Sequence, residues 1–338
     1  PISCSTLGRG DFIRVPLPAA MITMSNAMSC SPASNAPGVS DAIIGGVTHV
    51  PRSRRWAALR LVITLCALAW LTGCSAVRLA YNQAPDITYW WLDGYVDFSE
   101  PQSLRAKEAL VDWFSWHRRT ELPQYATLLS RARAEVSGPA TAEQACRWFD
   151  ELNVRFDAAF ERALPGLADV MRHLSPAQVA HLEHKYAENN ETLAEDYLQD
   201  RPEARAKVQF NRALDRIEMI YGRMSGAQRE RIAALALQTP FDPQRWLAER
   251  RRRQQDTLQT LTRLSGDQAT VEQAMVALRV LVQRSRVSPN DEYRDYQQRL
   301  VKFNCAFAAQ VHNMSTPEQR ARAADQLKDW EDDARWLA

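Results

Sequence analysis

From about residue 74 onward, apolar side chains recur every three or four positions, the spacing that places them on one face of an α-helix. Glycine is rare in this part of the chain, with six occurrences among 265 residues. Four stripes carry the pattern: Cys146, Phe149, Leu152, Phe156, Phe160 and Leu164; Val179, Leu182, Tyr186, Leu193 and Tyr197; Phe210, Leu214, Ile217 and Tyr221; and Tyr293, Tyr296, Leu300, Phe303, Phe307 and Val311. The sequence therefore predicts an all-α fold, a multi-helix bundle in which each stripe is a buried seam.

Proline, glycine and serine clusters divide this region into about ten predicted helices. The predicted breaks are Gly138-Pro139, Pro165-Gly166, Ser175-Pro176, Arg201-Pro202, Gly222, Pro240 to Pro243, Gly266, Ser288-Pro289 and Ser315 to Pro317. The segment from Val271 to Val282 is apolar on nearly all sides, so we expect that helix to lie nearest the centre. None of the breaks has the composition of a linker, so residues 74–338 are predicted to form one domain, with a split near Pro240 as the alternative.

An apolar-Ser-x-x-Gln pattern recurs at several of these breaks. It is present at Leu174 to Gln178, Met224 to Gln228 and Leu264 to Gln268, and in a looser form at Ser315 to Gln319. In a capping box the serine oxygen accepts a hydrogen bond from the third amide of the helix, and the glutamine reaches back to the amide of the capping residue. The repeats resemble the Leu-Thr-x-x-Gln repeats of small helical periplasmic chaperones, although capping alone explains them.

The stretch Leu71-Thr72-Gly73-Cys74 ends an apolar run that begins at Leu61. Four arginines lie before that run: Arg52, Arg54, Arg55 and Arg60. A basic segment, an apolar segment of about a dozen residues and small residues at the end describe a cleaved secretory signal. The ending on Cys resembles the lipobox of bacterial lipoproteins. In that family the Cys sulfur is diacylated, the leader is removed before it and the new amino group is usually acylated, which implies that Cys74 carries covalent lipid.

The predicted domain boundaries follow from this stretch. Residues 1–50 are rich in Ser, Pro, Ala and Gly without a periodic apolar pattern, so they are predicted to be spurious upstream sequence or a disordered tail. Residues 51–73 are the predicted lipoprotein signal peptide, and residues 74–338 the predicted helical periplasmic domain. Ser75 follows the Cys. In the lipoprotein sorting scheme that this resembles, Ser at that place implies a lipid anchor on the periplasmic face of the outer membrane.

The net charge of the chain changes sign at Cys74. The full sequence has 42 Lys and Arg against 40 Asp and Glu, but six of the bases and two of the acids precede Cys74, which leaves 36 against 38. The slight basicity comes from the leader region, so no nucleic-acid partner is indicated. Cys146 and Cys305 are the remaining cysteines of the predicted domain. They could form a disulfide only if their helices pack with those sides facing.

The sequence shows no motif that predicts catalysis. It lacks a Gly-x-Ser-x-Gly elbow, a phosphate-binding glycine loop and a His-Glu-x-x-His motif. His181, His184 and Glu188 lie on adjacent turns of one predicted helix and could supply part of a zinc site, but two solvated histidines are the simpler interpretation. We therefore predict no enzyme activity, no metal and no cofactor besides the covalent lipid on Cys74.

A run of four arginines interrupts the apolar seam of one predicted helix. Arg250, Arg251, Arg252 and Arg253 leave the middle of that helix polar on every side, so it is predicted to be solvated all round or to lie in an acidic groove. One interpretation is an anchor for anionic headgroups or an acidic partner. The alternative is a projecting, solvated helix with Glu249 and Asp256 nearby.

The segment from Tyr81 to Phe98 contains six aromatic residues directly after the predicted lipidation site. Its Tyr89, Trp90, Trp91 and Tyr95 are candidates for interaction. In one interpretation the aromatic rings pack against the bundle as its first helix. In the other, Trp90, Trp91 and Tyr95 lie at the membrane interface, where aromatic rings with polar edges are favoured.

The same segment is similar to that of a proteobacterial family of lipoproteins whose members pair a lipobox with a Tyr-Asn-Gln-Ala-Pro and a Tyr-Trp-Trp-Leu-Asp-Gly-Tyr sequence. The similarity covers Tyr81 to Pro85 and Tyr89 to Tyr95, and it continues through Trp113 to Arg118 and the Leu122 to Tyr125 turn. The resemblance implies a lipid-anchored helical protein and implies no activity.

Three functions from different classes remain. A membrane-anchored periplasmic lipoprotein that acts as a binding or scaffold component of the cell envelope, with an envelope protein as partner, fits the bundle, the anchor and the lack of catalytic motifs. A chaperone-like periplasmic holdase would have an exposed apolar concavity near the capping repeats. A hydrolase or metal enzyme would need a cleft where carboxylates or His181 and His184 converge. We predict the first, with the holdase as the alternative.

Overall fold

The computed structural model describes residues 76–199, 201–266 and 269–338, and its regular structure there is helical. The elements are α3 (Ala76–Asn82), α4 (Ala84–Val96), α5 (Glu100–Trp116), the π-helical turn η2 (His117–Glu121), α6 (Leu122–Glu135), α7 (Ala142–Met171), α8 (Pro176–Tyr197), α9 (Pro202–Tyr221), α10 (Gly226–Ala236), α11 (Pro243–Gly266), α12 (Val271–Arg286), α13 (Asp291–Met314) and α14 (Pro317–Leu337). The predicted all-α fold is confirmed over these residues. The predictions for the N-terminal extension, the signal peptide, the lipobox and Cys74 lie outside them.

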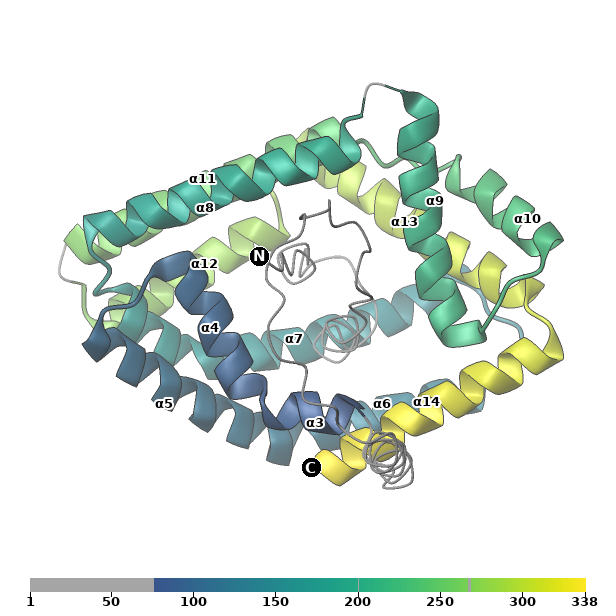
Figure 1. The fold of residues 1–338 in the computed structure, drawn as a ribbon, viewed down its shortest axis with the longest axis horizontal. Coiled ribbons are helices and arrows are strands. Elements are labelled where there is room, and N and C mark those ends of the chain that lie inside the picture. The colour runs from purple at the N-terminus through teal and green to yellow at the C-terminus, as the bar shows by residue number, and fades with distance from the viewer. Residues whose placement is uncertain (1–75, 200, 267–268) are drawn as a thin grey trace, which may run out of the picture.

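The helices run round a flattened ring that brings α14 back beside α3 (Figure 1). α8 and α11 lie side by side along one edge, and α14 packs along α6 on the opposite edge. α7, with 30 residues, is the longest helix and contacts α5, α12 and α13. Where the ring closes, Tyr81 of α3 and Leu337 of α14 share one buried cluster with Leu122 and Tyr125. The two ends of the described chain are therefore part of one core.

α12 contains the segment predicted to be most central, and this prediction is wrong. Val276 and Val280 on its outer face are exposed, while Ala274, Leu278 and Leu281 face inward. The helix packs on α7 and α11 and lies at the surface of the ring. The apolar residues of the outer face led to the prediction of burial on all sides, but apolar atoms also make up much of any folded surface.

α7 continues through Pro165 and Gly166, where the sequence predicted a break. A Cβ at Gly166 would lie 2.8 Å from the Cβ of Ala109 in α5, so glycine here allows two helices to approach closely. Pro165 removes one backbone hydrogen bond. The fully buried Leu164 and Ala168 on either side hold the helix against its neighbours, so tertiary packing overrides the local signal.

The capping-box predictions are confirmed at Ser175 and Ser225, whose side chains accept from the amides of Gln178 and Gln228. In the segment from Ser315 to Gln319 the capping residue is Thr316. The copy at Leu264 to Gln268 is not a cap, because Ser265 lies inside α11 and its Oγ donates to the Thr262 carbonyl. Further boxes, not among the predicted ones, begin α5, α7 and α12: Ser99 with Gln102, Thr141 with Gln144, and Thr270 with Gln273.

Four of the capping glutamines also join distant turns in pairs. In the first glutamine junction, Gln178 Nε2 donates to Gln102 Oε1 at 2.6 Å and to the Asp97 carbonyl at 2.8 Å, while Gln102 Nε2 donates to the His173 carbonyl at 2.8 Å. This junction ties the α4–α5 turn to the α7–α8 turn.

The second glutamine junction has the same arrangement. Gln228 Nε2 donates to Gln319 Oε1 at 2.7 Å and to the Met314 carbonyl at 3.1 Å, and Gln319 Nε2 donates to the Arg223 carbonyl at 3.0 Å. It ties the α9–α10 turn to the α13–α14 turn. A local cap therefore also makes a long-range contact in both places.

A disulfide joins Cys146 of α7 to Cys305 of α13, with a Cα–Cα distance of 5.3 Å and a sequence separation of 159 residues. The sequence alone left this pairing open. The bond fixes the N-terminal part of α7 to the helix that leads into the second glutamine junction.

Candidate functional site

The aromatic candidates of α4 fall into two environments. Tyr89 is buried, and its hydroxyl donates to Ser103 Oγ at 2.9 Å. The rings of Trp91 and Tyr95 are half-buried and 5.0 Å apart, and the Tyr95 hydroxyl accepts from Asn189 at 2.9 Å. The Trp90 side chain is 68% exposed. Three of the four rings therefore contact the domain, and Trp90 is the one that the surface presents.

α3 is fixed against the rest of the ring by polar as well as apolar contacts. Tyr81 is buried, and its hydroxyl forms a 2.7 Å hydrogen bond with His117 Nδ1. Arg78 Nε donates to Asp333 of α14 at 2.7 Å. The Arg118 guanidinium lies over the Tyr81 ring and donates to the Leu337 carbonyl at 3.3 Å. The first described helix is thus docked to both η2 and α14.

The π-helical turn η2 places a buried polar group under α3. Burial lowers the pKa of His117 to about 4, and the neighbouring Arg118 charge acts in the same direction. Burial also raises the pKa of Tyr81 and of Glu121, whose carboxylate lies 3.7 Å from Arg155. At neutral pH the imidazole is therefore uncharged, and the arrangement serves as an internal hydrogen-bonded contact.

Two apolar side chains near α3 were not among the sequence candidates. Leu79 and Trp336 are 57% and 56% exposed. The Arg78 guanidinium lies 4.9 Å from the centre of the Trp336 ring. In the sequence, each of these two residues is only an apolar residue that lies off the buried stripe of its helix. No local pattern indicates that the end of α14 lies beside α3.

The four-arginine run lies in α11, and of the two predicted environments the structure contradicts solvation on all sides, because acidic side chains of the same helix lie against the run. Glu249, only 5% exposed, accepts hydrogen bonds from Arg252 at 2.9 Å and Arg253 at 3.0 Å. Burial opposes ionisation, but these hydrogen bonds lower the pKa of Glu249. Arg250 donates to Asn190 at 3.0 Å, whereas Arg251 is exposed. Acids and amides of the domain itself therefore bind most of the run. Its role in binding a partner stays a prediction.

The two histidines considered for zinc contact different groups. His181 Nε2 is 3.2 Å from the Gly94 carbonyl, and His184 Nδ1 is 3.5 Å from Glu188. Within the described ranges, no three His, Cys, Asp or Glu side chains converge in a way that could hold a metal ion.

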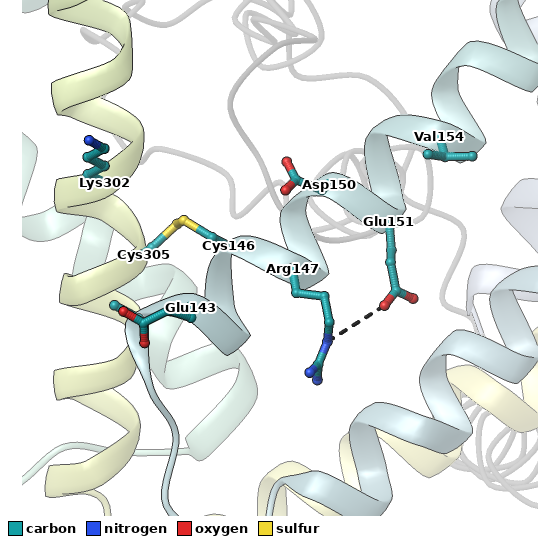
Figure 2. A pocket seen from close by; sticks show the side chains of 9 residues that line it. Glu143, Cys146, Arg147, Asp150, Glu151, Val154, Lys302 and Cys305 are labelled. Carbon is teal, nitrogen blue, oxygen red and sulfur yellow. Dashed lines mark ion pairs between the residues drawn. A yellow bond between two sulfur atoms is a disulfide. The ribbon is translucent and has the colours of Figure 1, made fainter.

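An open depression of about 690 Å³ lies beside the disulfide at the N-terminal end of α7 (Figure 2). It is lined by Ala142, Glu143, Cys146, Arg147, Asp150, Glu151, Val154, Lys302 and Cys305. Arg147 forms ion pairs with Glu151 at 3.7 Å and with Glu135 at 2.8 Å. Because the lining carries both signs of charge and its arginine is already paired, we assign no chemistry to this depression.

These observations define a disulfide-linked, all-helical protein whose first described helix is docked where the ring closes. Residues 94–294 match the family model described as "Family of unknown function (DUF6279)", and since this is more than half of the chain, the chain belongs to that family. No curated protein and no solved structure matches it. The matched range begins after Cys74 and after most of the aromatic segment, so the lipoprotein resemblance of those features stays a prediction. No helix among the described residues is both long and apolar enough to cross a membrane.

Proposed function

We propose that this chain is a lipoprotein of the cell envelope, held on the periplasmic face of the outer membrane by lipid on Cys74, where it acts as a binding or scaffold component. The docking of α3 carries the proposal. This helix begins two residues after Cys74 and is fixed to the domain by the Tyr81–His117 and Arg78–Asp333 contacts. A lipid on Cys74 would therefore hold a folded body close to the bilayer, without a long linker between anchor and domain.

The energetics of acylation fit such a role. Each buried methylene contributes about 0.8 kcal/mol, so two or three acyl chains anchor a protein stably where one does not. A protein partner in the envelope is supported by Trp90, a large aromatic side chain that stays exposed although its neighbours Tyr89 and Trp91 contact the domain. The slightly acidic balance after Cys74 gives no support to a nucleic-acid partner.

Membrane fractionation tests the anchor. The Cys74→Ala variant should leave the membrane fraction and remain soluble, while the unaltered protein sediments with outer membranes. A variant that still sediments with membranes would show that Cys74 is not the anchor.

Site-specific photocrosslinking in intact envelopes tests the partner. A photoreactive residue at Trp90 should yield a discrete crosslinked protein. The matched control is Leu237, which is 71% exposed after α10. Equal crosslinking from both positions, or none from Trp90, would contradict a partner at α4.

The chaperone-like holdase is the second candidate. It is favoured by the glutamine-linked capping boxes, which extend the resemblance to the helical chaperone repeats. The large apolar side chains that are exposed are spread over α3, α4, α5, α7, α12 and α14 and the residues after α10 and α12, which does not favour one apolar concavity. Suppression of the aggregation of an unfolded client by the purified protein would support the holdase over the scaffold.

A further inference from the structure

We propose that the corner formed by α3, the start of η2 and the last turn of α14 lies directly on the phospholipid surface and sets the orientation of the domain on it. We define Arg78, Leu79, Arg118 and Trp336 as the anchor-side face. The inference rests on the proposed anchor at Cys74, but it assigns membrane contact to side chains of the folded domain that an anchor does not itself require.

Contacts within the fold place Arg78, Arg118 and Trp336 at the same corner, and Leu79 follows Arg78 in α3. Arg78 joins α3 to α14 through Asp333 and lies over the Trp336 ring. Arg118 donates to Asn82 at 3.0 Å and to the Leu337 carbonyl, so it spans the same two helices from the side of η2. Leu79 lies on the outer side of α3, since Ala80 and Tyr81 are the buried residues of that helix. In Figure 1 the C-terminal end of α14 lies beside α3.

Chain geometry keeps this face close to the anchor. One residue, Ser75, separates Cys74 from Ala76, and Ala76 to Leu79 is helical. At about 3.5 Å per extended residue and about 1.5 Å per helical residue, the Leu79 Cα lies within about 12 Å of the Cys74 Cα. The headgroup layer on each side of a bilayer is roughly 5–8 Å thick. A domain tethered through lipid on Cys74 therefore keeps Leu79 close to the membrane, and an orientation with this face toward the bilayer brings Leu79 into the interface.

The chemistry of the face matches that interface. An indole ring with a polar edge is favoured at the level of the headgroups, and the exposed Trp336 presents one under Arg78, the chain neighbour of the exposed Leu79. The guanidinium groups of Arg78 and Arg118 are attracted to anionic headgroups over about a Debye length. Asp333, the acid nearest to Arg78, is buried and bonded to it. Orienting this face toward the bilayer removes the exposed apolar surface of two residues from water.

Fluorescence quenching on the acylated protein tests the orientation. The full protein is reconstituted into phosphatidylcholine and phosphatidylglycerol vesicles whose acyl chains carry bromine near the headgroup, and tryptophan quenching is measured. We expect Trp336→Phe to remove more than half of the quenching. Trp90→Phe and Trp148→Phe are the matched controls, because Trp90 is exposed on α4 and Trp148 lies on α7 among Arg131 and Arg147. Loss of quenching in either control, and none in Trp336→Phe, would overturn the proposal.

A second variant guards against a local defect at Trp336. Leu79→Glu places a charge on the exposed side of α3, so it should reduce the quenching of Trp336 while the protein still sediments with the vesicles. If it leaves the quenching unchanged, the proposal is wrong. Sedimentation distinguishes failure of the anchor from failure of the orientation. A wild-type protein that does not bind vesicles contradicts the anchor, whereas a bound protein whose Trp336 is not quenched contradicts only the orientation. Vesicles of phosphatidylcholine alone lack anionic headgroups, so they should give weaker quenching. Equal quenching in both kinds of vesicle would show that the two arginines do not orient the domain.

Discussion

The region from α3 to α8 and the region from α9 to α14 are held together by the same two kinds of contact, which are more buried in the first region than in the second. Each region has one tyrosine–histidine hydrogen bond, Tyr81 with His117 and Tyr221 with His312, and each contains one glutamine junction. In the first junction both glutamines are buried, whereas in the second both are only half-buried. The same capping sequence can therefore serve as an interior contact or as a surface one, depending on what packs over it.

The second region, whose glutamine junction is less buried, has further contacts with α7 and with the turn before it. His312 Nε2 lies 2.7 Å from the Gly138 carbonyl, and Asn313 donates to the Ala140 carbonyl at 2.8 Å. The disulfide between Cys146 and Cys305 joins α13 covalently to α7 itself. The comparison suggests that the first region depends on its buried polar groups, and the second on cross-links to α7.

Removing the disulfide should have the largest effect. The Cys146→Ser, Cys305→Ser double variant frees a loop of 159 residues in the unfolded chain, so we expect a loss of about 5 kcal/mol in the free energy of unfolding. Urea unfolding measures the loss, and reduction of the unaltered protein is the control. Hydrogen exchange should show lower protection at the second junction than at the first. Equal loss at both junctions would contradict the distinction.

Acid should weaken the first region through His117. Its pKa is about 4 in the folded protein and about 6.5 when unperturbed, so the unfolded chain binds the proton first as the pH falls. The stability that neutral His117 contributes is fully present above pH 6.5 and is lost toward pH 4, about 3 kcal/mol in all. Urea unfolding across this range measures the slope.

The matched variants for this experiment are His117→Asn and Glu121→Gln. His117→Asn should flatten the slope, because it removes the group that takes up the proton. The raised pKa of Glu121 changes stability in the opposite direction. The folded protein favours the protonated carboxyl of Glu121, so its contribution to stability falls as the pH rises. Glu121→Gln should therefore keep the His117 slope and make the net slope steeper, because it removes the opposing contribution. A slope that survives in His117→Asn would assign the acid sensitivity to another group.

The buried and half-buried glutamines provide a more direct comparison. Gln178→Ala removes the side-chain donor of the Asp97 carbonyl and one of the hydrogen bonds of the buried Gln102, which keeps its bond to the His173 carbonyl, so it should cost about 2 kcal/mol. Gln319→Ala should cost about 1 kcal/mol, because water can reach its partners. Gln144→Ala is the control for the cap alone, since its box begins α7 outside either junction. Equal costs at Gln178 and Gln319 would show that burial does not distinguish the junctions.

The sequence predicts those parts of the fold that depend on residues close in the chain. Helical periodicity indicates the all-α class, and the caps at Ser175 and Ser225 follow from a signal only four residues long. The same signal was readable at Ser99. The partners of the cap glutamines were not, because Gln102 and Gln178 are 76 residues apart and Gln228 and Gln319 are 91 apart. Periodicity shows which face of a helix is apolar but not what covers it, so α12 was placed too deep.

The candidate site shows the same limit. Trp90 was predicted as a candidate from its local aromatic context, whereas Trp336 needed the closure of the ring to bring α14 beside Arg78. For the arginine run, the sequence left solvation and an acidic environment as alternatives. Its carboxylate partner Glu249 is local, but its burial comes from neighbouring helices. Contacts between distant segments decide both outcomes.

The smallest effect is expected where α4 and α9 end. The two ends are alike: Asp97 and Gly222 have positive φ, and the carboxylates of Asp93 and Glu218 accept the amides of Phe98 and Met224. Asp97→Gly relieves left-handed strain of about 1 kcal/mol. Glycine also gives the unfolded chain more conformational freedom, which lowers stability by about 0.4–1 kcal/mol. The net change in the free energy of unfolding should therefore stay within about 0.5 kcal/mol in urea unfolding. A loss well above that would mean that the Asp97 side chain stabilises the first junction beyond its backbone carbonyl, and the two helix ends would then differ in chemistry as well as in depth.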